Sequence, residues 1–257
     1  MNGYLCRLAA VAMAGPGTVA VALFADDTDP SRWAALQGYF WDLLDGAGLT
    51  VLISVLSMLI AVLLGMVIAL LRLYGPAPLR WLALVYVEFF RGVPVLLLLV
   101  AIYYVLPRAA DASDWFWFPK LTALQAAVLA FGLNYAAYEA EIYRAGISSI
   151  AAGQWEAAAS LGMGPTLTFR RIVLPQALRV ILPPMTNDFV ALFKDTSVAS
   201  VIAVYELNKT YQSLVNDPAN YNYVIEIAAL TALLYLIMSV PLSYLSRYLE
   251  KRWAKAV

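Results

Sequence analysis

The sequence contains no histidine and only one cysteine, Cys6. Without histidine, the chain has no imidazole for acid–base chemistry near neutral pH or for binding a metal ion. A single cysteine excludes an intramolecular disulfide and a metal site built from several cysteines. The sequence also lacks a glycine-rich phosphate-binding loop, a dinucleotide-binding fingerprint and the G-x-S-x-G motif of hydrolases. We therefore expect no catalytic residue, no metal and no cofactor bound by this chain itself.

Charge is also scarce in this chain. Only 13% of the residues are charged, the 17 basic and 17 acidic residues cancel, and 63% of the residues are hydrophobic. Soluble domains are about half apolar and about a quarter charged. Zero net charge, without a basic field, argues against binding to nucleic acid. The excess of apolar residues predicts a membrane protein.

The apolar residues are concentrated in long runs. The first run, 49–71, has 23 residues and no charge, and about 20 apolar residues suffice to span a bilayer. One such run alone would also fit a helix buried in a soluble core, but their recurrence favours the membrane. We predict an all-α membrane protein with five spans: 49–71, 82–106, 121–143, 185–204 and 224–246.

Basic residues indicate the orientation of these spans. Ten of them fall on one side of the five-span arrangement: Arg72, Arg80, Arg144, Arg170, Arg171, Arg179, Arg247, Lys251, Arg252 and Lys255. The positive-inside rule makes this the cytoplasmic side. The loop 148–184 and the C-terminus are therefore expected in the cytoplasm.

The first 45 residues form a separate region, ahead of a transmembrane domain over 46–257. The apolar run 8–25 fits either a signal segment that is cleaved or a sixth helix that is retained. Four apolar residues that follow it recur at helical spacing and predict a short helix in the outer membrane interface. They are Trp33, Leu36, Phe40 and Leu44.

The loop 148–184 has a pattern of its own. Residues 154–161 are rich in alanine and predict a short helix, which Gly162 can end because glycine accepts a left-handed conformation. Pro165 suits the first turn of a second short helix. Three further prolines are expected to break the chain before the fourth span: Pro175, Pro183 and Pro184. The loop is thus predicted to project two short helices from the membrane.

A signature in this loop carries a family resemblance. Glu156-Ala157-Ala158, then Gly162 and Ile172-Val173-Leu174-Pro175 match the spacing E-A-A-x3-G-x9-I-x-L-P. By this signature the chain resembles the permease subunits of bacterial binding-protein-dependent ABC importers. Four more segments resemble the polar amino-acid subfamily: Phe90-Arg91-Gly92-Val93-Pro94, Ala140-Glu141-Ile142-Tyr143-Arg144, Leu182-Pro183-Pro184 and Lys194-Asp195-Thr196-Ser197. The resemblance covers the chain from about Trp41 to the C-terminus.

Two residues depart from the family pattern. Val93 stands where threonine is common, and Glu139 places an acid beside Glu141 where a small polar residue is common. We expect Glu139 to alter which solute is preferred.

The resemblance implies a fold and a division of labour. The fold would be the five-helix core of a type I ABC importer permease in the bacterial inner (plasma) membrane. This subunit would import amino acids together with a second permease, either a copy or a paralogue, and an extracytoplasmic solute-binding protein. ABC ATPase subunits would bind ATP and Mg. The residues implied in coupling to the ATPase are Glu156, Ala157, Ala158, Leu161, Gly162 and Met163.

Charged residues inside the predicted spans suggest a route for the solute. At about 100° per residue, Asp188, Asp195 and Glu206 share one face of the fourth span, if its helix continues to Glu206. Lys194 lies on the adjacent face of the same helix. This stripe is either a polar seam between helices or a wall of the translocation path, with carboxylates for an ammonium group and Lys194 for a carboxylate. The candidate path residues are Asp188, Lys194, Asp195, Asn134 and Tyr138.

Two pairs of intramembrane charges lie three residues apart, a spacing at which side chains meet on a helix. Glu88 and Arg91 are expected to pair in this way, and Glu141 and Arg144 repeat the spacing. We therefore expect both pairs to be local ion pairs.

An ion-coupled secondary amino-acid carrier or a channel is the alternative function. Secondary carriers are often built from two repeated halves. No internal repeat of 20–50 residues occurs in the sequence, so the ABC importer is the favoured prediction. In an ABC importer, Glu156 would either pair with a basic group on the ATPase or cap its own helix.

Overall fold

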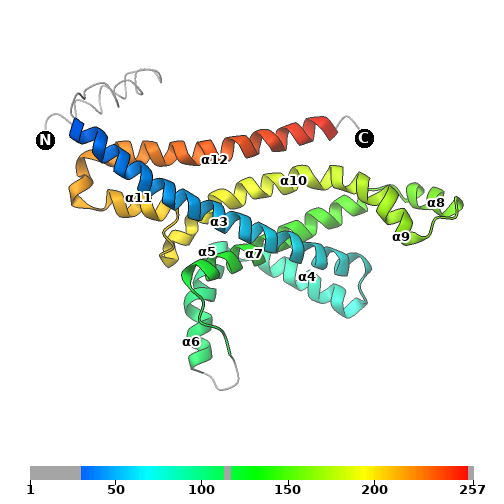
Figure 1. Ribbon diagram of the computed structural model, residues 1–257. Helices are drawn as coiled ribbons and strands as arrows, with labels where there is room; N and C mark the ends of the chain where they lie inside the picture. Colours follow the sequence, from blue (N-terminus) through cyan, green and yellow to red (C-terminus); the bar gives the residue numbers. More distant parts are fainter. Residues whose placement is uncertain (1–29, 113–116, 254–257) are drawn as a thin grey trace.

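The computed structural model describes residues 30–112 and 117–253, and all the regular structure in these ranges is helical. The two longest helices, α3 (Pro30–Tyr74) and α12 (Val224–Trp253), run along the length of the molecule (Figure 1). The predicted all-α fold is confirmed. The predicted N-terminal segment 8–25 lies outside the described residues.

Length and composition alone identify fewer spans than the five predicted. Within the residues that the structure describes, two helical stretches, Arg32–Tyr74 and Pro218–Arg252, are long and apolar enough to cross a membrane. A bent pair of helices makes a third if it counts as one span. The remaining two predicted spans correspond to α7 (Ala123–Ser148) and α10 (Leu174–Asp195). Both are helices of sufficient length, but each carries acidic side chains.

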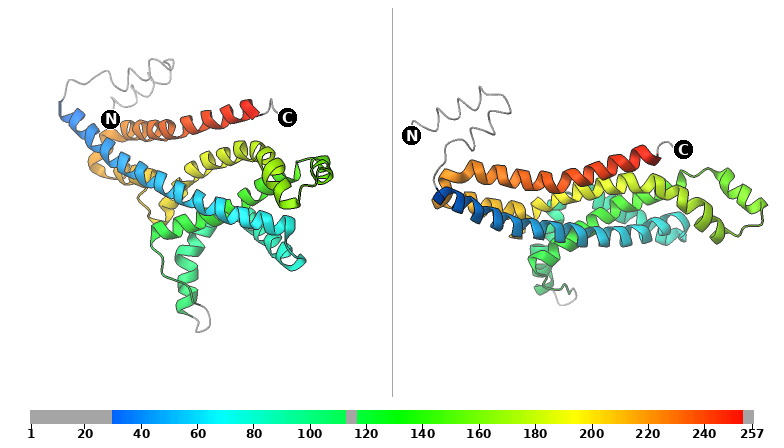
Figure 2. Two further views of the ribbon diagram at one scale, coloured as in Figure 1. Left: turned by 45° about the vertical axis from the view of Figure 1, so that its right-hand side comes forward. Right: turned by 45° about the horizontal axis from the view of Figure 1, so that its top comes forward.

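The second predicted span, 82–106, is wrong as a single helix. α4 (Ala77–Gly92) and the stretch Val95–Asp111 meet at an angle of 104°. That stretch consists of α5 (Val95–Val100), the π-helical η1 (Ala101–Val105) and α6 (Leu106–Asp111). A proline ring clashes with the carbonyl four residues earlier, so Pro94 ends α4. In Figures 1 and 2, α6 projects away from the other helices.

The core lies where α7 packs along α3. Fully buried side chains from α3, α5, α7 and α10 meet there, among them Ile53, Leu99, Phe131 and Leu192. Two glycines let the helix backbones approach closely, as small residues do between membrane helices. A Cβ atom on Gly65 would lie 2.8 Å from Glu139 Cβ, and one on Gly132 would lie 2.8 Å from Ile60 Cγ2.

The region predicted as an outer interfacial helix is continuous with the first span. α3 begins at Pro30 and runs without a break to Tyr74. Its first half packs against α11 (Leu207–Val215) and α12 through a second buried cluster, which includes Leu43, Leu207 and Ile227. Hydrogen bonding adds to this contact, since the Tyr39 hydroxyl donates to Asn220 Oδ1 at 2.7 Å.

The predicted break at the three loop prolines is wrong. α9 (Pro165–Thr168), the π-helical η2 (Phe169–Val173) and α10 follow one another directly. A π-helical turn can absorb the hydrogen bond that a proline removes, which is one way membrane helices tolerate proline. Pro175 lies just after this turn, and Pro183 and Pro184 lie inside α10. The α8–α9 end of the molecule is therefore joined to α10 by one helical path.

The fourth span ends earlier than predicted. α10 stops at Asp195 and is followed by the 3-10 helix η3 (Thr196–Ile202). Ala203 then takes a left-handed conformation with φ of 60°, which turns the chain toward α11. A second 3-10 helix, η4 (Pro218–Tyr223), connects α11 to α12.

Gly65→Ala is expected to destabilise the protein, because the added methyl group would lie 2.9 Å from the Ala136 carbonyl oxygen and 2.8 Å from Glu139 Cβ. Overpacking of this kind costs about 1–3 kcal/mol, and denaturant unfolding of the purified protein in detergent measures it. Gly48→Ala is the matched control on the same helix, since nothing lies within 4 Å of its added methyl group. Equal stability of the two variants would contradict the close approach of α3 and α7.

Candidate coupling loop and solute path

The predicted coupling loop contains a well-formed turn after α8 (Ala152–Ser160). Gly162 has a φ of +78°, its N–H donates to the Ala159 carbonyl at 2.9 Å, and the Met163 N–H donates to the Ala158 carbonyl at 3.0 Å. These two bonds are those of the Schellman motif. Nothing lies within 4 Å of a Cβ atom built on Gly162. The left-handed backbone, and not a lack of space, is therefore what requires glycine here.

The residues of the signature differ in their exposure. Ala158 is 1% exposed and packs into the loop, whereas Leu161 is 81% exposed. Glu156, Ala157 and Gly162 are exposed and Met163 is half-buried. α8 lies at one end of the molecule (Figure 1), and the turn that follows it exposes an apolar side chain, Leu161.

Glu156 does not cap its own helix in the described part of the chain. α8 begins at Ala152, and its N-cap residue, Ala151, makes no side-chain capping bond. Glu156 lies in the second turn of α8, beyond the unsatisfied N–H groups that a capping side chain would reach. The capping reading of Glu156 is therefore wrong, and its carboxylate is exposed on the loop.

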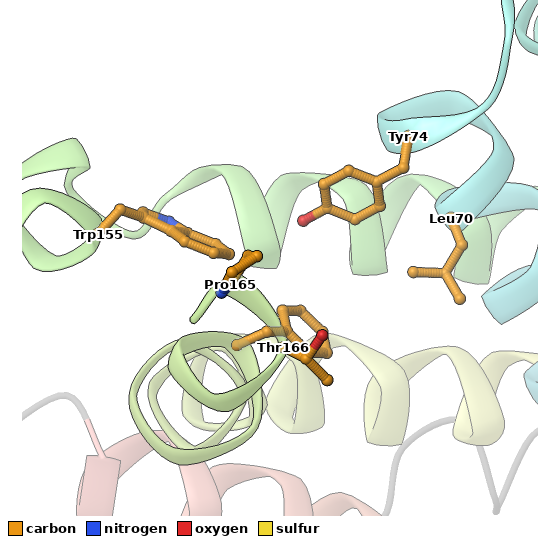
Figure 3. A pocket seen from close by; sticks show the side chains of 6 residues that line it. Leu70, Tyr74, Trp155, Pro165 and Thr166 are labelled. Carbon is orange, nitrogen blue, oxygen red and sulfur yellow. The ribbon is translucent and has the colours of Figure 1, made fainter. Parts of the chain in front are cut away.

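A groove separates the loop from the end of α3. It has a volume of about 300 Å³, and almost all of its wall is apolar. Figure 3 shows Leu70 and Tyr74 of α3 facing Trp155 of α8 across it, with Pro165 and Thr166 of α9 on the same side as Trp155. The base of the loop is anchored elsewhere, since Val173 and Ala177 are buried against Tyr143 and Ile147 of α7.

An ion cluster lies beside the loop and joins α3 to α7. The Glu141 carboxylate accepts hydrogen bonds from Arg72 and from Arg144, whose Nε lies 3.1 Å from Glu141 Oε1. The expected Glu141–Arg144 pair is confirmed. The expected Glu88–Arg91 pair is wrong, because among the described ion pairs neither residue appears. The Arg91 guanidinium lies instead over the Tyr138 ring, 5.4 Å from its centroid.

The structure brings several of the candidate path residues together between α7 and α10. The Tyr135 hydroxyl donates to Asp195 Oδ2 at 2.8 Å, and Tyr135 is also within electrostatic range of Asp188 and Tyr138. Arg91 acts electrostatically on Asp188 from the end of α4. Lys194 is exposed, and none of the ion pairs among the described residues joins it to this group. The group is a carboxylate-rich surface with one guanidinium beside it.

Asn134 has a structural task at the break in the second span. Its side-chain amide donates to the Phe90 carbonyl at 2.6 Å, and the residue is 5% exposed. Phe90 lies four residues before Pro94, so its carbonyl has no backbone N–H to accept from in the usual helical pattern. Asn134 supplies the missing donor and holds the end of α4 against α7.

Glu206 does not belong to the polar stripe predicted for the fourth span. It is fully buried and caps α11, accepting hydrogen bonds from the backbone N–H groups of Asn208 and Lys209 at 2.8 Å each. The Tyr235 hydroxyl also donates to it at 3.3 Å. The predicted stripe reached Glu206 only because the helix was assumed to continue, and η3 ends that helix first.

Two residues of this group, Arg91 and Tyr135, were not among the path residues predicted from the sequence. Arg91 was detectable as a charge inside a predicted span, which is by default a functional candidate. Tyr135 had no signal in the sequence, because its role depends on the register between α7 and α10.

The comparisons with known proteins agree with the resemblance. A model of the family "Binding-protein-dependent transport system inner membrane component" matches residues 61–255. The chain is 38% identical over 221 residues to the L-cystine transport system permease protein TcyB of Bacillus subtilis (strain 168), covering 86% of this chain and 90% of that protein. It is 35% identical over 220 residues to the glutamine transport system permease protein GlnP of Escherichia coli (strain K12), covering 86% and 96%.

Solved structures show the same fold. The structure titled "Crystal structure of an amino acid ABC transporter with histidines" matches with a TM-score of 0.74 and 31% identity, covering 88% of this chain and all of that one. The MetNI methionine ABC transporter in an inward-facing conformation matches with a TM-score of 0.59 and 19% identity, covering 87% and 99%. At that identity the second match shows the fold alone.

Asn134→Leu is expected to destabilise the protein by about 1–3 kcal/mol, because the buried Phe90 carbonyl would lose its donor. The loss should be smaller in a Pro94→Ala background, where the restored backbone N–H can serve that carbonyl. Denaturant unfolding of the four proteins of this cycle measures the difference, with Asn216→Leu as the control at an exposed position. An equal loss in both backgrounds would show that Asn134 does not compensate for Pro94.

Proposed function

Because the chain belongs to the family of binding-protein-dependent transport system inner membrane components, we propose that it is the permease subunit of an ATP-driven importer of amino acids. The observation that carries the proposal is the loop after α8, where the turn at Gly162 holds Leu161 exposed at the end of the molecule. The substrates named for the relatives, cystine and glutamine among them, support an amino acid as the solute.

Energy would come from separate ATPase subunits that hold ATP and Mg. The exposed surface of the loop, formed by Glu156, Ala157, Leu161, Gly162 and Met163, would bind a groove on the ATPase. Leu161 would provide the apolar contact, and Glu156 would pair with a basic group of the ATPase, since it caps nothing in its own helix. Ala158 would act from inside the loop, because it is buried.

The loop is built to transmit a movement to α10. It continues into α10 through η2 without a break, so a displacement of α8 and α9 would move α10 as a rigid body. The ion cluster of Arg72, Glu141 and Arg144 would keep α3 and α7 together while α10 moves. Because α10 carries Asp188 and Asp195, the movement would reach the proposed path directly.

The path would lie along the surface that α7 and α10 share. Asp188 and Asp195 would attract the ammonium group of the amino acid, and Arg91, held over the Tyr138 ring, would receive its carboxylate. Lys194 is exposed and would face the passage between two permease subunits. Asn134 would support the path by fixing the end of α4.

A second permease, a copy or a paralogue, would cover surface that is exposed in the single chain. The stretch formed by α5, η1 and α6 exposes apolar side chains, including Leu97, Tyr104 and Val105, and α6 projects from the bundle (Figure 2). Buried between two subunits, such side chains would contribute packing in place of contact with lipid. The extracytoplasmic binding protein would dock at the opposite end of the molecule from α8.

The direct test reconstitutes the chain with its ATPase, binding protein and any paralogous permease in proteoliposomes. Amino-acid uptake should require ATP, and Gly162→Leu should abolish uptake and ATPase binding, because a branched side chain in a left-handed turn costs on the order of 1 kcal/mol or more. Gly162→Asn is the control, since asparagine tolerates this conformation. Uptake driven by an ion gradient without the ATPase would support the secondary carrier instead.

Orientation is tested with single cysteines in a Cys6→Ser background. Gln154→Cys in α8 should resist an impermeant thiol reagent in intact spheroplasts and react after lysis, because the basic residues place this loop in the cytoplasm. Lys120→Cys, at an exposed position that the proposed topology puts on the other side of the bilayer, should react in both preparations. Labelling of the cysteine at position 154 in intact spheroplasts would reverse the proposed topology.

A further inference from the structure

Glu139 is a carboxyl group buried completely between the helices. Its side chain is fully buried, and neither carboxylate oxygen has a hydrogen-bond partner among the residues the structure describes. On one side, Glu139 Cβ faces Gly65 of α3 at the closest approach of the two helices. Ionisable side chains inside the membrane are rare and costly, and by default they have a function.

The register of α7 against α10 locates Glu139 within the proposed path. Tyr135, Glu139 and Tyr143 follow at intervals of four residues and so share one face of α7. Tyr135 donates to Asp195 at 2.8 Å and Tyr143 to Met185 Sδ at 3.7 Å, so this face runs antiparallel along α10. Glu139 lies midway between these two contacts, at the level of Asp188.

The seam between α7 and α10 contains more acid than base. Three carboxyl groups lie along it, those of Asp195, Asp188 and Glu139. Asp188 lies close enough to Glu139 to act on it electrostatically. The cation that acts on this group is Arg91, which stacks on Tyr138. Tyr143, one turn from Glu139, donates its hydroxyl to Met185 Sδ and also lies close enough to the Glu139 carboxyl to interact with it. A positive charge that enters the seam would therefore find a carboxyl that forms none of the ion pairs of the described chain.

We propose that Glu139 determines the specificity of the path, by binding the side-chain ammonium or guanidinium group of a cationic amino acid when α10 moves away from α7. This inference rests on the proposed function and narrows its substrate class to amino acids with a positively charged side chain. Asp188 and Arg91 would hold the backbone ammonium and carboxylate groups. Glu139, one helix away, would hold the additional charge, which a neutral amino acid such as glutamine lacks.

The experiment measures binding of radiolabelled lysine and glutamine to the purified permease–ATPase complex without the binding protein, so that the permease alone discriminates. The wild-type complex should bind lysine more tightly than glutamine. Glu139→Gln, which keeps the shape of the side chain, should weaken lysine binding roughly tenfold or more, the effect expected for a lost charge-assisted hydrogen bond. Glutamine binding should change little. Glu88→Gln removes the same charge from an exposed position of α4 and should change neither.

Each outcome decides the question. Equal binding of lysine and glutamine by the wild-type complex, or an equal loss of both in Glu139→Gln, would overturn the specificity role. If Glu139→Gln does not assemble, Glu139→Ser gives the same measurement with a smaller polar side chain. If Glu139→Gln keeps the preference for lysine and has a higher denaturation temperature than the wild type, Glu139 belongs only to a structural seam, and the proposal is overturned. If the wild-type complex takes up no amino acid in the presence of ATP, the proposed function itself is refuted.

Discussion

Pro94 has no N–H to offer the Phe90 carbonyl, and much of the arrangement around the proposed path follows from that lost hydrogen bond. α4 ends there and the following stretch, Val95–Asp111, turns by 104°. Asn134 of α7 supplies the missing donor at 2.6 Å, which fixes the end of α4 against the middle of α7. Arg91 is then held over the Tyr138 ring and beside Asp188. A covalent feature of one residue thus places the guanidinium of the site.

The same bundle contains two kinds of connection between helices, and they suit different tasks. α3 and α7 are joined by close glycine packing at Gly65 and by the Glu141 ion cluster, so their relative position is firmly determined. α10 is attached to α7 through a seam of polar side chains that includes the unpaired Glu139. Because α10 alone is continuous with the loop at Gly162, it is the helix best connected to move when that loop moves.

The cost of burying Glu139 is consistent with such a seam. A carboxyl group that lacks hydrogen bonds in one state of a transporter disfavours that state, and a cationic solute that reaches it would favour another. The Cβ atom of Glu139 packs against Gly65 of α3.

The sequence by itself determined the helical class, the signature loop and the left-handed turn at Gly162, because long apolar runs and glycine conformation are local properties of the chain. It also predicted the Glu141–Arg144 pair, whose members are neighbours on one helix. It did not predict the bend at Pro94, the uninterrupted path through Pro175, Pro183 and Pro184, or the cap made by Glu206. Only the tertiary structure decided these. The donors or π-helical turns that compensate for a proline, and the partners of Asn134 and Tyr135, depend on how distant helices lie beside one another.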